Sequence, residues 1–505
     1  MYPIDFFHRA CRNFSSNIAI VSSAQTLTYA ELGQRVAALA AGLQELDSQA
    51  GSRVGICAGN TVEHVVAQLA VLAAGKVWIP LNPRSAVPEL DRIITFTKPS
   101  IVMASAKYGS ALAMTGVTHR VALDSLFAAA NASYGALLQS HAGLAPHRHV
   151  MADDALQAIK FTGGSTGVPK GVMQTYRTWR SAVINLIDAY GFNEDDCNLL
   201  AAPITHGAGT YLLPVFAKGG RHLILDEMNA ETVLDAMQQH GVTNVFMPPT
   251  LFYMVMAAGA TRNCAFPRLR HLIYGGAPMP VGKIREAQQF FGPVVEVTYG
   301  QTEAPQIVSF LSGKELLDPR NVSSVGRASL LSDFSIMLPD GSLAAVGEVG
   351  EIVVRGPMIM AGYLEQPDKS AETIVDGWLH TGDLGYLDER GYLYLRGRSR
   401  EVIITGGFNV YPVDVEDTFG KHPDVQEVAV FGVEDEKWGE AVCAAIHLKD
   451  GSTASEAELI RYAKEQMGSV KAPKHIHFLD GLPRNPVGKI DKLILKGMHG
   501  GSVKS

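Results

Sequence analysis

A glycine-rich segment with hydroxyl side chains and one lysine could bind phosphate. It runs from Phe161 to Gly171 as Phe-Thr-Gly-Gly-Ser-Thr-Gly-Val-Pro-Lys-Gly. Glycines let backbone N–H groups converge on an anion, hydroxyls add donors, and Lys170 adds positive charge. The segment differs from a Walker A loop, because Gly171 and not Ser or Thr follows the lysine. A flexible surface loop is the alternative. The predicted phosphate-binding residues are Thr162, Gly163, Gly164, Ser165, Thr166, Gly167 and Lys170.

Two further segments carry groups suited to a planar ring and a divalent cation. In Gly275-Gly276-Ala277-Pro278, small residues after an apolar run let the backbone approach a flat ring, and Tyr299 could stack on that ring. Glu303, four residues after Tyr299, offers a hard oxygen ligand that could hold Mg²⁺ together with phosphates. Ordinary strand-end turns and a solvated carboxylate are the alternatives.

Polar groups elsewhere suggest a sugar contact but no protein nucleophile. Asp383 ends a Thr-Gly-Asp turn, where a carboxylate could accept two hydrogen bonds from a ribose diol.

The cysteines are scattered, so they form neither a disulfide framework nor a CxxC metal motif. None has catalytic neighbours in a motif. They are Cys11, Cys57, Cys197, Cys264 and Cys443.

The elements that must position these groups follow from apolar periodicity. Thr28-Tyr29-Ala30-Glu31 fits a capping box, and the apolar spacing after it predicts an amphipathic helix from about residue 29. An apolar run at 54–57, a helical pattern at 62–74 and a second run at 77–79 form a βαβ unit, which implies a parallel sheet. We therefore predict an α/β fold in which doubly wound layers form the large N-terminal region.

Changes of pattern predict the domain organisation. From about residue 321, short alternating strands separated by Gly, Asp and Pro turns indicate a β-rich subdomain reaching to about 397. Strands and helices then alternate again over roughly 100 residues. We predict a large domain at 1–397, a small α+β domain at 398–505 and a hinge at about 398–400.

Composition excludes several classes of protein. The chain has 505 residues, of which 47% are hydrophobic and 18% charged, so it folds and has room for several domain-sized units. Its net charge of −7 argues against a nucleic-acid partner. The richest apolar stretch, 64–80, is interrupted by Gln68 and Lys76, so we predict no integral membrane segment. No secretory signal is visible, and we expect a cytoplasmic protein.

The motifs together resemble the adenylate-forming superfamily, which includes acyl- and aryl-CoA synthetases, luciferases and adenylation domains of peptide synthetases. The resemblance covers nearly the whole chain, because the matches occur in order. They are the loop at 161–171, Tyr274-Gly275-Gly276-Ala277-Pro278, Tyr299-Gly300-Gln301-Thr302-Glu303, Gly350-Glu351-Ile352, Gly377 to Asp383, Gly397-Arg398, Gly406 to Pro412, and Pro483 to Asp491.

The resemblance implies a role for each matching residue. It implies catalytic roles for Thr302, Glu303 and Lys489, with Glu303 also binding Mg²⁺. Lys489 would sit between the carboxylate and the α-phosphate, where attack of one anion on another needs a cation. Arg400 would be the hinge. Beyond the phosphate loop, the nucleotide-binding and CoA-binding residues would be Gly276, Ala277, Pro278, Thr298, Tyr299, Gly300, Gln301, Asp383, Arg398, Gly406, Gly407 and Trp438.

Two of these assignments keep a structural alternative. Gly406 and Gly407 would border the tunnel for the thiol arm of CoA, since glycine lets backbone flank a slim chain closely, but a plain turn is the alternative. Trp438 matches a position that stacks on the nucleotide of CoA in some relatives, although a tryptophan at a turn is as often part of packing.

The resemblance implies a carboxylic acid:CoA ligase that uses ATP, Mg²⁺ and coenzyme A. The alternatives are an adenylation enzyme that loads a carrier-protein phosphopantetheine, a luciferase-like oxygenase and a non-catalytic nucleotide-binding protein. A homodimer is left open. The segments that would line the acid pocket contain no Lys or Arg, so we expect a neutral monocarboxylic acid.

Thr298, where many relatives carry glycine, should shorten this pocket and favour a compact aryl or short-to-medium aliphatic acid. His206 is interpreted as a pocket-lining or gating residue, or else as a packed histidine at a helix start. The predicted acid-binding residues are His206, Gly207, Thr210, Tyr274, Gly275 and Thr298.

Overall fold

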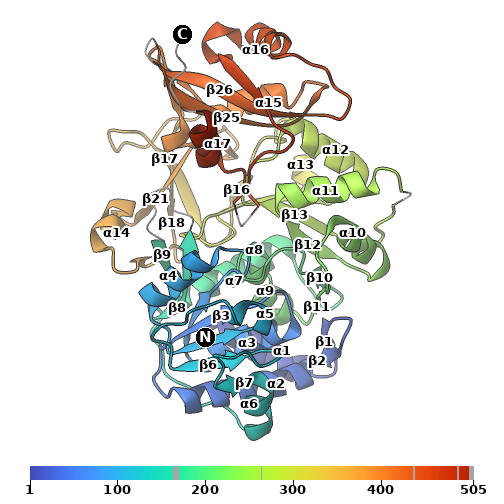
Figure 1. The fold of residues 1–505 in the computed structure, drawn as a ribbon, viewed down its shortest axis with the longest axis vertical. Helices are drawn as coiled ribbons and strands as arrows, with labels where there is room; N and C mark the ends of the chain where they lie inside the picture. The colour runs from blue at the N-terminus through green and yellow to red at the C-terminus, as the bar shows by residue number, and fades with distance from the viewer. Residues whose placement is uncertain (163–169, 263, 436–437, 486–487, 500–505) are drawn as a thin grey trace.

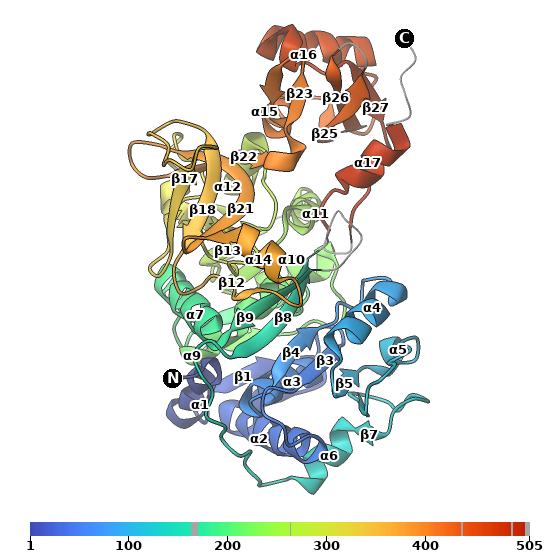
Figure 2. The same cartoon turned by 90° about the vertical axis from the view of Figure 1, so that its left-hand side faces the viewer.

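The computed structural model describes residues 1–162, 170–262, 264–435, 438–485 and 488–499. The described part forms four sheets with helices packed around them (Figure 1). The last sheet and its helices form a separate layer above the rest, as Figure 2 shows from the side. No helix of the described ranges is both long and apolar enough to span a bilayer.

One sheet has eight strands in the order β19-β9-β8-β4-β3-β5-β6-β7. Its centre is parallel, as the βαβ pattern predicts, whereas β9 runs antiparallel to both β8 and β19. The strands are β3 (Arg53–Cys57), β4 (Val77–Pro80), β5 (Ile101–Ala104), β6 (His119–Ala122), β7 (Ala132–Ser133), β8 (Leu156–Thr162), β9 (Lys170–Thr175) and β19 (Gly362–Tyr363).

A second sheet has nine strands in the order β16-β15-β14-β13-β12-β10-β11-β1-β2. The run from β14 to β1 is parallel, and both edges are antiparallel. The strands are β1 (Ile18–Val21), β2 (Thr26–Thr28), β10 (Cys197–Leu199), β11 (Arg221–Leu223), β12 (Asn244–Met247), β13 (His271–Gly275), β14 (Val295–Tyr299), β15 (Ser309–Leu311) and β16 (Arg327–Ala328).

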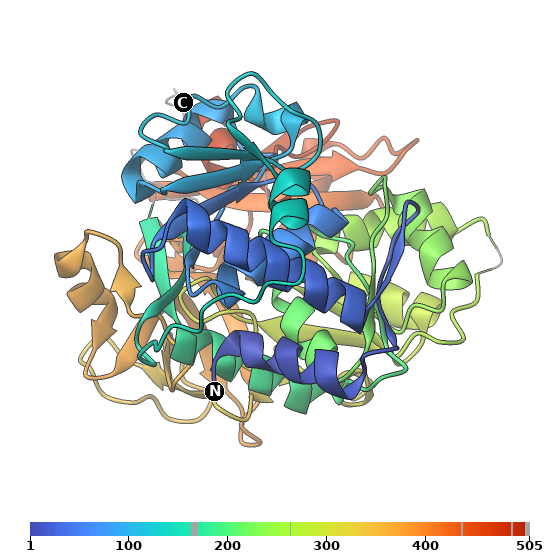
Figure 3. The same ribbon diagram turned by 90° about the horizontal axis from the view of Figure 1, so that it is seen from below.

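Helices cover these two sheets, and the view from below in Figure 3 shows the first helices lying across them. The capping box predicted before residue 29 is present, because Thr28 and Glu31 exchange side-chain to backbone hydrogen bonds. The helices are α1 (Pro3–Asn13), α2 (Tyr29–Leu46), α3 (Val62–Ala73), α4 (Val87–Thr97), α5 (Ala106–Gly109), α6 (Tyr134–Ser140), α7 (Tyr176–Tyr190), α8 (Gly207–Thr210), α9 (Leu212–Ala217), α10 (Ala230–Gln239), α11 (Pro249–Gly259), α12 (Val281–Phe291), α13 (Gly313–Leu316) and α14 (Pro367–Thr373).

The β-rich segment forms a third, antiparallel sheet. Two of its short strands are shared with the neighbouring sheets, because β16 pairs with β15 and β19 pairs with β9. The segment is thereby joined to both sheets of the large region. Its strands are β17 (Asp333–Met337), β18 (Gly350–Arg355), β20 (Ile374–Val375), β21 (Trp378–Leu387) and β22 (Leu393–Arg398).

The last part of the chain folds as an α+β unit with its own core. The predicted fold class, α/β layers followed by a β-rich region and a small α+β unit, is confirmed. A short 3₁₀ turn, η1 (Ser399–Glu401), links β22 to this unit. The elements are β23 (Ile403–Thr405), β24 (Phe408–Val410), α15 (Pro412–Phe419), β25 (Val425–Asp435), β26 (Gly439–Leu448), α16 (Glu456–Lys471), β27 (His475–Phe478) and α17 (Lys492–His499).

Candidate active site

The carboxylate of Asp383 is held from both sides. Its Oδ1 lies 2.6 Å from Nε of Arg398, the register partner of Asp383 on β22. Its Oδ2 accepts hydrogen bonds from the Tyr299 hydroxyl, at 2.7 Å, and from the Gln301 amide. Asp383 is 8% exposed. Four predicted nucleotide-binding residues, widely spaced in sequence, therefore form one cluster, and the carboxylate keeps lone pairs for further donors.

The Gly300 backbone explains how Tyr299 and Gln301 turn toward Asp383. A Cβ on Gly300 would lie 2.6 Å from the backbone carbon of Gln306, so only glycine fits this turn. Gln306 itself adopts a left-handed conformation with φ of 67°. The close approach folds the 300–306 segment back on itself and places Glu303 at its tip.

Glu303 and Lys170 both contact Tyr363. The Tyr363 hydroxyl donates to Oε1 of Glu303 at 2.9 Å, and Lys170 Nζ lies 5.5 Å from the centre of the tyrosine ring. The predicted phosphate-binding lysine and the predicted metal ligand are thus brought together by a residue of β19. The backbone oxygen of Thr302 accepts a hydrogen bond from Gln174 of β9, which fixes the same turn from the other side.

The chemistry of these donors fits Mg²⁺ bound jointly with phosphate. Mg²⁺ keeps several waters and needs few protein carboxylates, and Glu303 supplies one partly exposed carboxylate. In the described ranges, no three His, Cys, Asp or Glu side chains come together to hold a metal by themselves. Glu303 would therefore hold the ion together with phosphate oxygens.

Only the ends of the phosphate loop can be placed. Thr162 is the last residue of β8 and pairs with Lys170, the first residue of β9. The predicted residues between them lie outside the described residues; these are Gly163, Gly164, Ser165, Thr166 and Gly167.

Lys489 reaches the large domain from the small one. A Cβ on Gly276 would lie 3.9 Å from Cε of Lys489, and Gly276 has a positive φ of 82°. The side chain keeps an exposed surface. Desolvation by the surrounding protein lowers the pKa of Lys489, and the charge of Arg398 adds to this, whereas Asp383 and Glu303 oppose it. The lysine therefore sits within electrostatic range of the nucleotide cluster and the metal ligand.

Thr250 of α11 docks the turn that carries this lysine. Its hydroxyl donates to the backbone oxygen of Gly488 at 3.0 Å and accepts from Nη1 of Arg484 at 2.7 Å. A second contact between the two regions is the ion pair of Arg396 on β22 with Asp414 on α15, at 2.7 Å. These contacts set the observed position of Lys489.

His206 caps the one-turn helix α8 and is partly buried. Burial lowers the pKa of its ring to about 4, and the positive charges of Lys160, Lys489 and Arg84 act in the same direction. The ring is therefore neutral at neutral pH. Its Nδ1 lies 2.9 Å from the Thr205 hydroxyl, a hydrogen-bond distance. His206 is both packed at a helix start and close to the cations of the site.

Glycines in and beside α8 are required by close contacts. A Cβ on Gly207 would lie 2.4 Å from the Phe246 ring, and one on Gly209 would lie 1.9 Å from the Ile204 oxygen. A Cβ on Gly275 would lie 2.8 Å from the Thr298 backbone oxygen and 3.0 Å from its Cγ2. Phe246 thus separates α8 from the Gly275 and Thr298 pair.

The hydroxyl of Thr298 turns to the backbone and donates to the Gln306 oxygen at 2.9 Å. The side chain of Tyr274 lies away from this pair. Successive side chains of a strand point to opposite faces of the sheet, and Gly275 occupies the face next to Thr298 and Phe246. Tyr274 is buried on the other face against Phe252 of α11.

Residues predicted for the hinge and for CoA lie on the small domain or its link. Arg400 is exposed within η1. Gly406 and Gly407 form the turn between β23 and β24, with φ of 56° and 82°. A Cβ on Gly406 would lie 2.9 Å from the Trp438 ring, whereas the position over Gly407 is open. Trp438 is 39% exposed and packs on Gly406.

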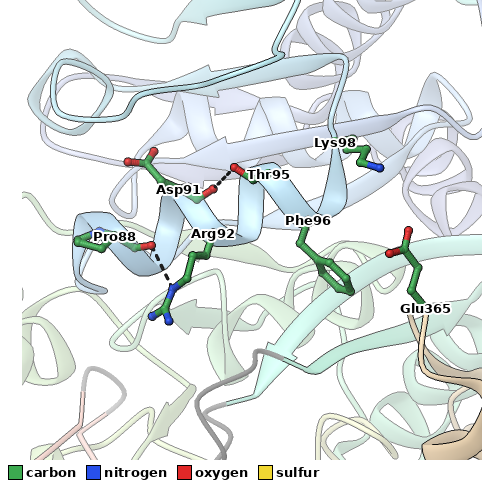
Figure 4. Close-up of a pocket in the computed structure, with 7 residues that line it drawn as sticks. All are labelled: Pro88, Asp91, Arg92, Thr95, Phe96, Lys98 and Glu365. Atoms are coloured by element: carbon green, nitrogen blue, oxygen red, sulfur yellow. Dashed lines mark hydrogen bonds between the residues drawn. The ribbon is translucent and has the colours of Figure 1, made fainter.

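The remaining predicted nucleotide-binding residues follow β13. Gly276 and Pro278 are exposed and Ala277 is partly exposed, as expected for a segment that meets a ligand. A separate surface hollow of about 440 Å³ lies against α4 and involves Glu365. Asp91 and Arg92 point to opposite sides of that helix (Figure 4). None of the predicted site residues lines this hollow.

Sequence reasoning missed four residues of the site: Lys160, Phe246, Thr250 and Tyr363. Each meets its partner from a distant part of the chain. Of these four, Lys160 alone has an unusual sequence context, because it is an isolated charge within the apolar strand that precedes the phosphate loop.

The chain belongs to the AMP-binding enzyme family. The family model described as "AMP-binding enzyme" matches residues 7–364, and that described as "AMP-binding enzyme C-terminal domain" matches residues 414–489. A feruloyl-CoA synthase of Amycolatopsis sp is 34% identical over 480 residues, covering 94% of each chain. An indoleacetate–CoA ligase of Aromatoleum aromaticum is 31% identical and covers 92% of each chain.

Solved structures agree over the full length. The amide bond synthetase McbA from Marinactinospora thermotolerans superimposes with a TM-score of 0.90 at 28% identity, covering 99% of this chain and 100% of that one. ATP-bound MatB from Rhodopseudomonas palustris gives a TM-score of 0.88 at 30% identity, covering 99% of both.

Proposed function

We propose that the protein is an ATP-dependent carboxylic acid:CoA ligase that first makes acyl-AMP and pyrophosphate and then transfers the acyl group to CoA, releasing AMP. The observation that carries this proposal is the position of Lys489 over Gly276, near both the Asp383 cluster and Glu303. A cation placed between a nucleotide site and a metal ligand is what attack of a carboxylate on a phosphate requires.

In the first step, the residues of the large domain bind and orient ATP. Asp383 would accept hydrogen bonds from the ribose, and the 275–278 segment would flank adenine. Lys170 would bind phosphate. Glu303 would hold Mg²⁺, which when bound neutralises phosphate charge. Lys489 would stabilise the charge that builds up as the carboxylate oxygen bonds to the α-phosphorus and pyrophosphate leaves.

In the second step, the CoA thiolate would attack the acyl carbon and AMP would leave. We propose that the small domain, residues 398–505, rotates at Arg400 so that Lys489 withdraws and the Gly406-Gly407 turn meets the thiol arm. Supporting this, η1 is a short exposed link, and Gly407 has open space above it. Trp438, with its exposed face, would then contact the nucleotide of CoA.

Carrier-protein loading is the second candidate for the final acceptor. A fatty acid–[acyl-carrier-protein] ligase, ScoC of Streptomyces coeruleorubidus, is 29% identical and covers 94% of this chain. CoA remains our proposal, because the feruloyl-CoA synthase and the indoleacetate–CoA ligase are more similar in sequence. The names of the relatives do not decide the acid, since FadD8 and FadD13 of Mycobacterium tuberculosis, 34% and 30% identical, are named for medium/long-chain and long-chain fatty acids. We propose a compact aryl or short-to-medium aliphatic acid because Thr298 would shorten the pocket. We propose a cytoplasmic enzyme; a homodimer would be tested by light scattering.

The test is pyrophosphate release with ATP and Mg²⁺ over a panel of benzoate, cinnamate, hexanoate, palmitate and malonate, followed by thioester analysis with CoA or a phosphopantetheinylated carrier. We expect release with a compact neutral acid and thioester formation with free CoA. A clear preference for palmitate or malonate would show the acid assignment to be wrong, and a product formed only on the carrier would favour the second candidate.

A further inference from the structure

A buried lysine lies behind α8 without a hydrogen-bond acceptor. Lys160 of β8 is 8% exposed, and its Nζ lies beside a perpendicular pair of indole rings, 5.2 Å from the centre of Trp78 and 5.4 Å from that of Trp179. No residue of the described ranges accepts a hydrogen bond from its ammonium group or pairs with its charge. Burial lowers the pKa of Lys160 to about 8, so it is mostly charged at neutral pH.

A second buried lysine shows what a purely structural role requires. Lys76 is 1% exposed, and its ammonium donates to the oxygens of Asp47 and Gln49 and to the Ser52 hydroxyl, at 2.6, 3.2 and 2.8 Å. A largely desolvated ammonium without an acceptor is costly. The Lys160 Nζ keeps a small accessible surface at which an acceptor could bind. The two tryptophan faces offset part of this cost for Lys160 but leave its donors unused.

These donors border a small cavity whose lining includes Thr210, one of the predicted acid-binding residues. The cavity has a volume of about 20 Å³, and its lining includes Lys160, Trp179, Gly209, Thr210 and Leu213. That is room for about one water molecule or one small substituent. Gly209 and Thr210 belong to α8, whose first end is capped by His206 near Lys489. One helical turn, about 6 Å, therefore separates the reacting end of the pocket from Lys160.

We propose that Lys160 is a specificity-determining residue whose ammonium group donates a hydrogen bond to a neutral oxygen at the far end of the acyl group. The proposal rests on the proposed ligase function. It defines the acid as one that carries a hydroxyl, methoxy or carbonyl oxygen about one aromatic ring away from the reacting carboxylate. A second carboxylate fits less well, because the cavity is small and largely apolar, and a second ion would have to be desolvated within it.

The arrangement also connects the far end of the pocket to the catalytic turn. The Trp179 indole donates to Oε1 of Gln174 at 2.9 Å, and the Gln174 amide donates to the Thr302 oxygen at 2.8 Å. An oxygen bound by Lys160 would thus lie near the Trp179 ring. Trp179 is hydrogen-bonded to Gln174, and Gln174 holds the turn that contains Thr302 and Glu303.

The experiment compares acids that differ by one oxygen. The catalytic efficiency of pyrophosphate release is measured for cinnamate against 4-hydroxycinnamate, and for hexanoate against 6-hydroxyhexanoate and adipate. We expect the wild type to favour at least one hydroxylated acid over its partner by about 10- to 100-fold, as a hydrogen bond to a charged group allows. Lys160→Met, which keeps the side-chain length, should abolish that preference and leave the unsubstituted acids active.

Controls separate this proposal from the ligase proposal. Lys107→Met removes an exposed lysine that also lies over an aromatic ring, and it should leave the preference unchanged. If unsubstituted acids release pyrophosphate but neither wild-type pair shows a preference, Lys160 does not select an oxygen while the ligase function stands. Preference for adipate, or an equal preference in wild type and Lys160→Met, also overturns the proposal. If no acid supports pyrophosphate release, the proposed ligase function itself is wrong. The wild-type comparison remains decisive even where Lys160→Met does not fold.

Discussion

At the scale of single residues, the site is largely organised before a nucleotide binds. Asp383 is fixed by Arg398, Tyr299 and Gln301, so it would lose little freedom in the proposed contact with a ribose. Lys489 differs, since it comes from another domain and retains an exposed surface. The two steps of the proposed reaction should therefore respond differently to substitutions in these two groups.

Lys489→Ala should slow acyl-AMP formation by about 10²- to 10³-fold and leave thioester formation from synthetic acyl-AMP nearly unchanged. The lysine acts on charge that develops only in the first transition state. The measurement is pyrophosphate exchange for the first step and CoA-dependent thioester formation for the second. Equal loss in both would contradict the proposed rotation of the small domain.

The family resemblance assigned Tyr299, Gln301, Asp383 and Arg398 to one site, and the structure brings these four side chains together. Their role in binding a nucleotide stays a prediction. Lys160 and Thr250 could not be predicted, since their roles arise only where β8 passes behind α8 and where α11 meets the distal turn. The orientation of Tyr274 has a simpler explanation. A motif names a backbone segment, whereas the alternation of a strand decides which side chain faces the ligand.

At the scale of elements, α11 holds the distal turn in place through a single hydroxyl. Thr250→Val would remove both the hydrogen bond to Gly488 and the one from Arg484. We expect adenylation to fall by about 10-fold and thioesterification to change little. Thr250→Ser keeps the hydroxyl and should restore the rate of pyrophosphate exchange. If the serine variant is as slow as the valine variant, the hydroxyl is not what docks the turn.

A substitution in the β23–β24 turn should affect the second step of the reaction and not the first. Gly407→Leu should slow thioesterification and spare adenylation, because the position over Gly407 is open in the observed arrangement. Leucine at a positive φ also strains the backbone by about 1 to 2 kcal/mol. Gly451→Leu provides a matched control, since Gly451 has the same φ of 82° and open surroundings. A comparable loss of thioesterification in both variants would assign the effect to strain.

The elements themselves were predictable where local signals were strong. The capping box at Thr28 and the βαβ unit at 53–80 follow from short-range patterns. The sharing of β16 and β19 with neighbouring sheets does not, because these two-residue strands have no periodicity and are defined by their partners.

At the scale of the whole molecule, buried neutral histidines make stability depend on pH. Burial lowers the pKa of His64 and His206 to about 4 and that of His222 to about 3. An unfolded histidine titrates near 6.5, so the unfolded chain binds more protons below that pH. The free energy of unfolding therefore decreases as pH falls from about 6.5 to about 4, by up to about 1.4 kcal/mol per pH unit for each group.

Thermal unfolding recorded between pH 7.5 and 5 should show this decrease in Tm. His222→Gln should flatten the dependence, whereas replacing the exposed His240 should not. A Tm that stays constant over this range would show that these rings are not neutral in the folded chain.

The contact between Gly275 and Thr298 constrains how the acid pocket can evolve or be engineered. A side chain at 275 meets a backbone oxygen, which no change at 298 can remove. A change at 298 alters a methyl group and a hydroxyl only. A library that randomises position 298 would therefore test the predicted length of the acid pocket, while any side chain at position 275 would have to displace the backbone of β14.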